Sequence, residues 1–363
     1  MNRENAMIGI IGGYGSVGRW AVKSLSKHMD EIIKVGGRSK TAYEMCVERH
    51  QLKHTEFAKV DFADLNSVRQ FAKGCRLILN CAGPTFGRSL KVADTVLGLG
   101  SCYVDVGFDN HMDELFKRYN NRNLLCKAGA IPGLSGLLPR YLANKLGQAE
   151  QVVVYYSALG KFSKTASEDY LNGIFGSGIA VTGKRKEVER KLLPLSSQES
   201  YLYPYYDSEC DYVSRSLQPA SCKWFMALEG ESSNMFMSNA GELYLQNQER
   251  AIAGLCDASY ADTLSNSEYA GFVVQTSGIG NGMDMCQTLY LKAPSPEYLT
   301  GTATAAAVLL TDKYCGLTGG SELSMIQDVE GYLEILKEIG TAIEIRIETG
   351  TIADLLIQEE GEI

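Results

Sequence analysis

The sequence predicts an α/β chain of two domains: a doubly wound parallel sheet with helices on both faces, then a second α+β domain. Between residues 7 and about 125, short apolar runs alternate with amphipathic helical patterns, as in chains that form parallel sheets. A tight glycine cluster separates the first run from the first helical pattern. Beyond residue 150 the apolar runs are longer and partly alternating, which predicts an open, mostly antiparallel sheet.

The glycine cluster lies between a strand-like run at residues 7–11 and a helical pattern that begins at Val17. It follows the spacing G-x-G-x-x-G, in which the glycines allow a sharp turn, a close approach of backbone N–H groups to a pyrophosphate, and tight helix packing. This context favours a Rossmann-type dinucleotide site over a turn that needs glycine only for its geometry. The expected cofactor contacts in the cluster are Gly13, Tyr14, Gly15, Ser16, Val17 and Gly18.

The first domain is predicted from the alternation of its elements. Strands are expected at residues 7–11, 31–36, 56–60, 77–81 and 102–106, and helices at 17–28, 41–50, 65–72, 88–97 and 112–128. Ligands of such sheets bind beyond the carboxyl ends of the strands, so the residues after each strand are the candidates for the site.

The residues after the second strand indicate which nucleotide is preferred. NAD proteins usually carry Asp or Glu there, which accepts hydrogen bonds from the ribose 2′-hydroxyl. This chain has Arg38, Ser39 and Lys40 instead, which would attract a 2′-phosphate. We therefore expect NADP(H) to be preferred over NAD(H), with a solvated basic turn as the alternative.

Two further strand ends supply candidates for the cofactor site. Asp61 follows the third strand and could border the adenine, or it could cap the next helix. Small residues follow the fourth strand and would let the nicotinamide lie against the backbone: Cys81, Ala82, Gly83 and Pro84.

The second domain is expected over residues 129–292, as a substrate and dimerisation domain. Its predicted strands are 151–158, 234–237, 269–277 and 285–291, and a helix is expected at 137–146. The aromatic run 201–206 could line a substrate pocket or cover a strand surface. An alanine-rich helix at about 297–315 and the C-terminal segment, with a helix at 326–337 and a strand at 342–348, should return to complete the first domain, 1–128.

Bulk properties exclude several classes of protein. A formal net charge of −8 argues against a nucleic-acid binder. No apolar run approaches the roughly 18 residues of a membrane span, and the first strand begins too early to leave room for a signal peptide. The ten cysteines include no C-x-x-C pair, which predicts reduced thiols in a cytoplasm and no metal site.

The chain resembles the saccharopine dehydrogenase-like family of NAD(P)-dependent oxidoreductases. The resemblance rests on GGYGSVG at 12–18, VGGRS at 35–39, NCAGP at 80–84, CYVDVG at 102–107 and IPGLSGLLPRYLA at 131–143. It is strong over the first 145 residues and weak across 150–290. The segment GLDPGxDH of some lysine-pathway members is replaced by AIPGLSG at 130–136, without the Asp and His, which argues against a plain lysine-catabolic saccharopine enzyme.

Candidates for the chemistry are few. Hydride transfer needs orientation, a dry cleft and a group that handles one proton. For that group we expect Asp105, at the end of the fifth strand, and His111, which follows it; a helix cap and a water-facing helix terminus are the alternatives. The expected substrate contacts are Ser135, Tyr103 and Phe108.

The family resemblance implies reduction or oxidation of C–N bonds of amino-acid conjugates. We therefore expect NADP(H)-dependent reduction of a C=N bond in an amino-acid-derived or specialised-metabolite substrate, by a homodimer. One alternative is reduction of an activated C=C bond in an enoyl or dehydroamino-acid group. Another is a non-catalytic NADP(H)-binding sensor or scaffold, which would lack a cavity beside the nicotinamide.

Overall fold

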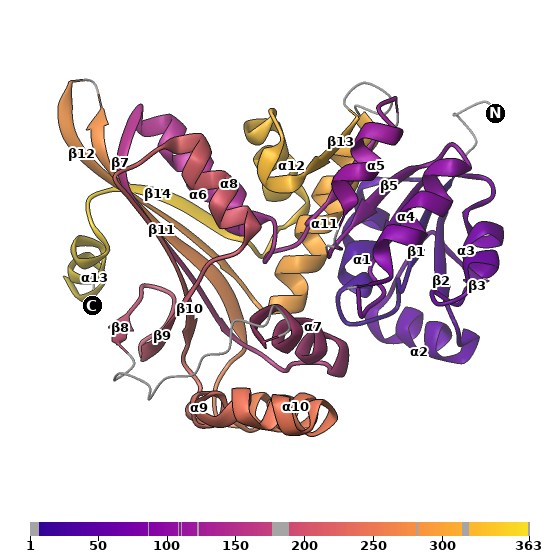
Figure 1. Cartoon of the computed structure of the whole chain (residues 1–363), viewed down its shortest axis with the longest axis horizontal. Helices are drawn as coiled ribbons and strands as arrows, with labels where there is room; N and C mark the ends of the chain where they lie inside the picture. Colours follow the sequence, from indigo (N-terminus) through magenta and orange to yellow (C-terminus); the bar gives the residue numbers. More distant parts are fainter. Residues whose placement is uncertain are drawn as a thin grey trace. The chain divides into compact units, whose positions relative to one another are not determined.

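The computed structural model describes residues 7–85, 87–107, 109, 111–121, 123–175, 189–280, 282–313 and 319–361. The chain divides into two units. Unit 1 comprises residues 1–134 and 297–341, and unit 2 comprises residues 135–296 and 342–363. Each unit is built around its own seven-stranded sheet (Figure 1).

The sheet of unit 1 is parallel throughout, with the strand order β13-β6-β5-β4-β1-β2-β3. Its strands are β1 (Met7–Ile11), β2 (Ile33–Gly37), β3 (Thr55–Lys59), β4 (Cys75–Asn80), β5 (Cys102–Asp105), β6 (Leu124–Cys126) and β13 (Gly320–Glu322). The first six strands have the Rossmann order, in which β1 and β4 meet where the direction of winding reverses. The predicted fold class is confirmed.

Helices cover both faces of this sheet. They are α1 (Gly18–His28), α2 (Lys40–His50), α3 (Leu65–Ala72), α4 (Ser89–Gly98), α5 (Met112–Arg118), α11 (Pro296–Lys313) and α12 (Val329–Ile339). Apolar residues of α3, α4 and α5 share one core cluster with the strands. On the other face α11 packs against α1, where a Cβ on Gly301 would come within 2.6 Å of Trp20. The late helix thus joins unit 1 although residues 29–295 separate it from α1.

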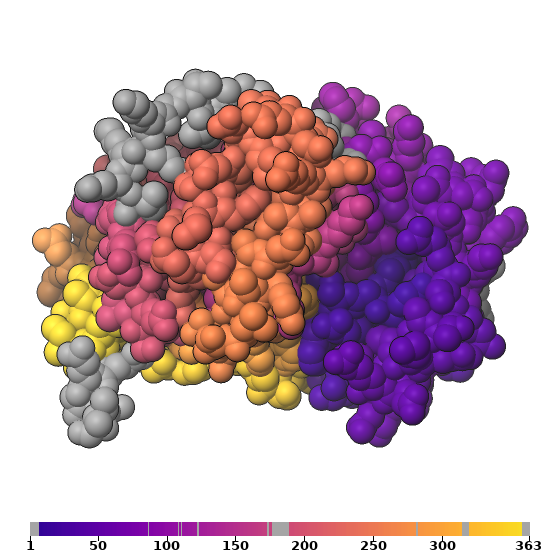
Figure 2. All heavy atoms as spheres, turned by 90° about the horizontal axis from the view of Figure 1, so that it is seen from below, coloured from indigo at the N-terminus to yellow at the C-terminus, as the bar shows by residue number. Residues whose placement is uncertain are grey.

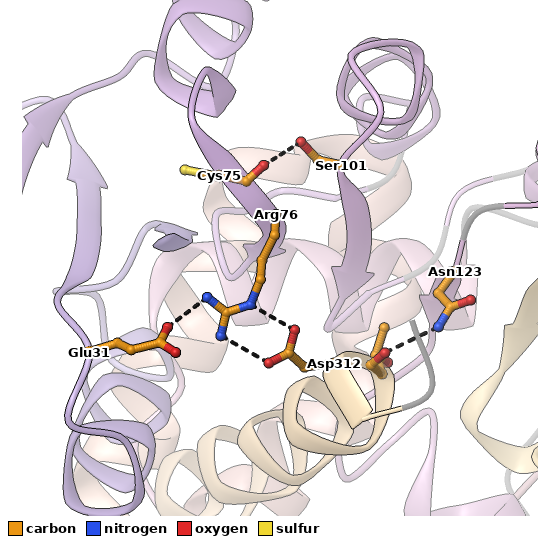
Figure 3. Close-up of polar contacts among 7 residues, drawn as sticks. Glu31, Cys75, Arg76, Ser101, Asn123 and Asp312 are labelled. Atoms are coloured by element: carbon orange, nitrogen blue, oxygen red, sulfur yellow. Dashed lines mark hydrogen bonds and ion pairs between the residues drawn. The ribbon is translucent and has the colours of Figure 1, made fainter. Parts of the chain in front are cut away.

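Polar side chains tie the amino edge of the same sheet together (Figure 3). The guanidinium of Arg76, at the start of β4, binds both carboxylate oxygens of Asp312 at 2.9 Å and Glu31 at 2.6 Å. Ser101, just before β5, donates to the carbonyl of Cys75 at 2.7 Å. These contacts fasten the end of α11 to the strands.

The sheet of unit 2 has the order β14-β12-β11-β7-β10-β9-β8. Its strands are β7 (Gln148–Leu159), β8 (Arg190–Leu192), β9 (Glu199–Tyr205), β10 (Ser221–Leu228), β11 (Tyr269–Gly280), β12 (Met283–Ala293) and β14 (Glu344–Thr349). As described, β7 and β10 pair in parallel and the other neighbours are antiparallel. The expected open, mostly antiparallel sheet is therefore present.

The helices of unit 2 fall into two groups and a C-terminal helix. They are α6 (Leu134–Leu146), α7 (Lys164–Phe175), α8 (Ser208–Leu217), α9 (Glu231–Gln246), α10 (Gln248–Asp262) and α13 (Ile352–Gly361). Figure 1 shows α6 and α8 along the sheet and α9 and α10 side by side at one end of it. Of the described helices, none combines the length and apolar character required to traverse a bilayer.

Three sequence expectations are wrong. The helix expected over 112–128 ends at Arg118, because Leu124–Cys126 form the buried strand β6. The strand expected at 234–237 lies inside α9, since a four-residue apolar run fits either structure. The C-terminal segment is divided between the units: α12 joins unit 1, but β14 pairs with β12 in unit 2 and is followed by a helix, α13.

The cysteines depart from expectation at one position. The free cysteines are Cys46, Cys75, Cys81, Cys126, Cys210, Cys222, Cys256 and Cys286. Cys102, at the start of β5, is disulfide-bonded, so the expectation of reduced thiols is wrong there.

Candidate functional site

The loops after β1 and β4 meet at the point where the sheet reverses its winding. Gly12, directly after β1, has a φ of +74°, and a Cβ there would lie 2.9 Å from the amide nitrogen of Ala82. Only glycine allows both this conformation and this approach. The sharp turn thus lies one residue before the first glycine of the predicted motif.

The N-terminus of α1 has features that suit the binding of an anion. A Cβ on Gly18 would overlap the carbonyl oxygen of Gly12, so this glycine lets the helix approach the strand. A Cβ on Gly15 would lie 3.1 Å from the carbonyl oxygen of Gly12 and would otherwise point into open space. The cap residue Val17 makes no side-chain capping bond, and the first turn has no acidic residue. The positive end of the helix is therefore uncompensated, which fits a diphosphate.

The basic residues after β2 lie on the surface at the start of α2. Ser39 is the N-cap of that helix, and its hydroxyl oxygen accepts from the amide of Ala42 at 3.2 Å. Lys40 lies 3.7 Å from Glu44, both exposed. Arg38 is exposed and has no salt bridge among the described residues. This loop can present cations and a hydroxyl to an anionic group.

Asp61 follows β3 and belongs to a turn. Its carboxylate accepts from the amide of Ala63 at 3.0 Å, and α3 is capped by Asp64 instead. The helix-cap alternative for Asp61 is therefore wrong, and its place beside the adenine stays a prediction.

The residues from Cys81 to Pro84 are half-buried and keep some exposed surface. Asn80 holds the loop by accepting from the amide of Ala82 at 3.1 Å. Burial raises the pKa of the Cys81 thiol, and the carboxylate of Asp105 raises it further. The thiol therefore stays protonated, which suits lining of the cleft rather than nucleophilic attack.

Asp105 is the centre of a buried network that joins the ends of β4 and β5. Its carboxylate accepts from the hydroxyl of Tyr103 at 2.6 Å, the amide side chain of Asn80 at 3.1 Å and the backbone of Gly107 at 2.8 Å. Burial raises the pKa of Asp105, and the hydrogen bonds it accepts oppose this rise. Asp105 and Tyr103 are both 0% exposed, so neither has a surface that a substrate could touch.

The other predicted catalytic and substrate residues are also placed differently from expectation. The His111 side chain is 70% exposed, 3.3 Å from Glu114, at the cap of α5, which is the water-facing alternative. Ser135 is 1% exposed; its hydroxyl donates to Glu209 and its carbonyl accepts from Trp224 at 3.2 Å. The Ser135 hydroxyl is therefore bound to a carboxylate of the chain itself. Phe108 lies outside the described residues.

Sequence reasoning missed a buried ion pair at the carboxyl edge of the sheet. Lys127, after β6, lies 2.8 Å from Glu322, at the end of β13, and their side chains are 3% and 10% exposed. The backbone of Lys127 donates to Gly107, next to the Asp105 network. The helix expected over 112–128 concealed Lys127, which becomes a strand-end residue once β6 is recognised.

The aromatic run 201–206 contributes to a cavity within unit 2. Tyr201, in β9, donates to Glu231 at 2.7 Å and lies under Arg190. The cavity has a volume of about 230 Å³ and is lined by, among others, Arg190, Glu199, Tyr201, Glu229, Glu231 and Asp262. Among the described residues no cluster of histidine, cysteine and carboxylate side chains could hold a metal.

Comparison with known proteins agrees with this geometry. Residues 8–127 match the family model of the saccharopine dehydrogenase NADP binding domain. No curated protein sequence matches the chain. The apo saccharopine dehydrogenase (L-Glu forming) of Saccharomyces cerevisiae is 12% identical, with a TM-score of 0.67 over 95% of this chain and 100% of that one.

Two other solved structures are less similar. An engineered D-amino acid dehydrogenase bound to NADP⁺ is 16% identical, with a TM-score of 0.48 over 92% of this chain and 96% of that one. The DAP dehydrogenase of C. glutamicum is also 16% identical, with a TM-score of 0.46 over 97% and 98%. The chain shares the fold of the yeast saccharopine dehydrogenase, and its residues 8–127, in unit 1, match the saccharopine dehydrogenase NADP binding domain.

Proposed function

We propose that the chain is an NADP(H)-dependent oxidoreductase that transfers a hydride to the C=N bond of an amino-acid-derived or specialised-metabolite substrate. One observation carries the proposal: the uncapped, acid-free start of α1 lies at the switch point, and the exposed loop after the neighbouring β2 is basic. The first feature suits a diphosphate and the second suits a 2′-phosphate.

Each part of the cofactor has residues that would hold it. Residues 13–18 would bind the diphosphate through backbone N–H groups, and residues 38–40 the 2′-phosphate. Asp61 would border the adenine, and residues 81–84 would flank the nicotinamide. When bound, NADPH supplies the hydride of the reaction.

The choice of a C=N bond is supported by the full-length likeness to a saccharopine dehydrogenase and by the C–N chemistry of the family. A protonated imine accepts hydride without a further proton, so the protein needs only to orient it and exclude water. This agrees with a site in which Asp105 is wholly buried and His111 lies in water. The placement gives neither residue a direct part in proton transfer.

Isothermal titration with NADPH and NADH tests the proposal, with Arg38→Ala as the variant. Losing a charge-assisted contact to the 2′-phosphate should weaken NADPH binding by about 1.5–3 kcal/mol, roughly ten- to hundredfold, and leave NADH binding nearly unchanged. Arg69→Ala, which removes an exposed arginine from α3, is the matched control and should change neither affinity. Equal losses for both nucleotides in Arg38→Ala would contradict the assignment of the 2′-phosphate.

Turnover assays distinguish C=N reduction from C=C reduction and from a non-catalytic role. Loss of NADPH absorbance should follow addition of amino-acid-derived imines and not of enoyl thioesters. Turnover of the enoyl compounds alone would establish the C=C alternative, and tight NADPH binding with no turnover in a broad panel would favour a sensor.

We further propose a cytoplasmic homodimer formed through unit 2. Eight of the described cysteines are free, which supports a reducing compartment, although Cys102 is disulfide-bonded. Large apolar side chains are exposed on and beside α9 and α10, at Met235, Leu245, Tyr260 and Leu264. Figure 2 shows that these two helices form a broad part of the surface of unit 2. A monomeric mass by light scattering would contradict the dimer.

A further inference from the structure

Tyr14, in the glycine loop, lies over the end of β2. Gly37 is the last residue of β2, the position at which NAD-binding Rossmann proteins carry the Asp or Glu that binds the ribose. A Cβ on Gly37 would overlap the ring and hydroxyl of Tyr14. No side chain at position 37 can therefore coexist with Tyr14 where it lies, and this includes a carboxylate that would bind the 2′-hydroxyl.

A hydrogen bond holds Tyr14 in this place. Its hydroxyl oxygen accepts from the backbone N–H of Ser39 at 2.9 Å. Ser39 is itself fixed as the cap of α2 through its bond to Ala42. In the part of the chain that the structure describes, no acceptor takes the proton of the Tyr14 hydroxyl. This proton remains available to an anion at the loop.

The charged groups around Tyr14 favour such an anion. Arg38 and Lys40 flank Ser39 on the surface. Of the nearby carboxylates, Glu44 lies beside Lys40, and Asp61 accepts a bond within its own turn. Tyr14 therefore excludes a carboxylate from the end of β2 and adds a hydroxyl donor to a cationic loop.

We propose that Tyr14 is the residue that selects NADP(H) over NAD(H): its ring excludes an acidic side chain from position 37, and its hydroxyl donates to the 2′-phosphate. This inference rests on the proposed function and specifies how the cofactor is chosen. It predicts that positions 14 and 37 act as a coupled pair.

The hydroxyl is tested by Tyr14→Phe, which keeps the ring. The variant should bind NADPH about tenfold more weakly and NADH with unchanged affinity, since only the 2′-phosphate loses a donor. The matched control is Tyr43→Phe in α2, which removes a hydroxyl bonded to Thr55 and should leave the ratio of affinities unchanged. An equal change for both nucleotides in Tyr14→Phe would overturn the donor role.

The ring is tested by a double-mutant cycle with Gly37→Asp and Tyr14→Ala. Gly37→Asp alone should weaken the binding of both nucleotides, because the new side chain displaces the ring of Tyr14. The double variant should regain NADH binding and prefer it to NADPH. Failure of Gly37→Asp to fold, with recovery in the double variant, would also support the coupling.

Two results would overturn the coupling: additive effects of the two substitutions, or a double variant that keeps the preference for NADPH. Failure of the proposed function is distinguishable, because the unmodified protein would then bind neither nucleotide.

Discussion

The two edges of the sheet in unit 1 are built differently. At the amino edge, side chains cross-link the strands to α11: Arg76 binds Asp312 and Glu31, and Asn123 donates to the carbonyl of Thr311 at 3.1 Å (Figure 3). At the carboxyl edge, between β1 and β4, backbone meets backbone through glycine. One edge of this sheet uses its polar groups internally, and the other is the edge at which we propose that backbone N–H groups bind the diphosphate.

The amino edge needs its charges because of α11. The helix ends there, so its negative dipole end and the carboxylate of Asp312 lie together. Arg76 neutralises both, and its hydrogen bond with Asp312 is the largest cause of the raised pKa of the guanidinium. A segment far along the chain is thereby held on the sheet.

The largest effect should come from breaking the amino edge. Arg76→Met leaves Asp312 partly buried without its partner, and unfolding free energy should fall by about 3 kcal/mol. Urea denaturation measures this loss, and NADPH affinity should be unchanged. The double variant Arg76→Met/Asp312→Leu should recover most of the loss, since the partly buried carboxylate is gone and Glu31, whose side chain is 51% exposed, is solvated by water. A fall in NADPH affinity without a fall in stability would reverse the roles of the two edges.

A smaller effect is expected from the glycines of the carboxyl edge. In Gly18→Ala the new methyl overlaps the Gly12 carbonyl, so stability should fall by about 1–3 kcal/mol. Gly15→Ala meets little within the protein and should leave the urea midpoint almost unchanged. It should still weaken NADPH binding more than tenfold, because the methyl enters the space of the diphosphate. Unimpaired nucleotide binding by Gly15→Ala would place the diphosphate elsewhere.

The smallest effect should be a pH dependence at Asp105. Because burial raises its pKa in the folded state, the folded protein binds the proton more tightly than the unfolded chain does. Stability of the wild type relative to Asp105→Asn should therefore decline as pH rises above about 3.9, the usual pKa of Asp, and level off above the folded pKa. Paired urea titrations from acid to neutral pH measure this. A relative gain of the wild type with rising pH would mean that the hydrogen bonds outweigh burial.

Much of unit 1 could be predicted because its signals are local. The strand at 7–11 and the helix at 65–72 have the predicted bounds, since each apolar pattern spans one complete element. Unit 2 was harder. The run 234–237 is too short to show a helical period. In unit 1 the exception was β6, a three-residue strand that continues the apolar pattern of α5.

The candidate site shows the same division. Gly15 and Arg38 could be predicted as site residues from the sequence. The first follows from the spacing of the glycines, and the second from its position after a predicted strand. The burial of Asp105 and the pairing of Lys127 with Glu322 could not. Whether a polar side chain at a strand end faces the cleft or the core depends on what packs over it, and for Lys127 that partner is almost 200 residues away.

The sequence by itself determined the alternation of strands and helices from residue 7 to residue 105, the glycine turn and the basic loop after β2, because periodicity and backbone conformation depend on neighbouring residues. Only the tertiary structure decided that Tyr14 covers Gly37, that Arg76 binds Asp312, and that the Ser135 hydroxyl donates to Glu209. Such contacts join residues distant in sequence, and their energies arise only once the elements are packed.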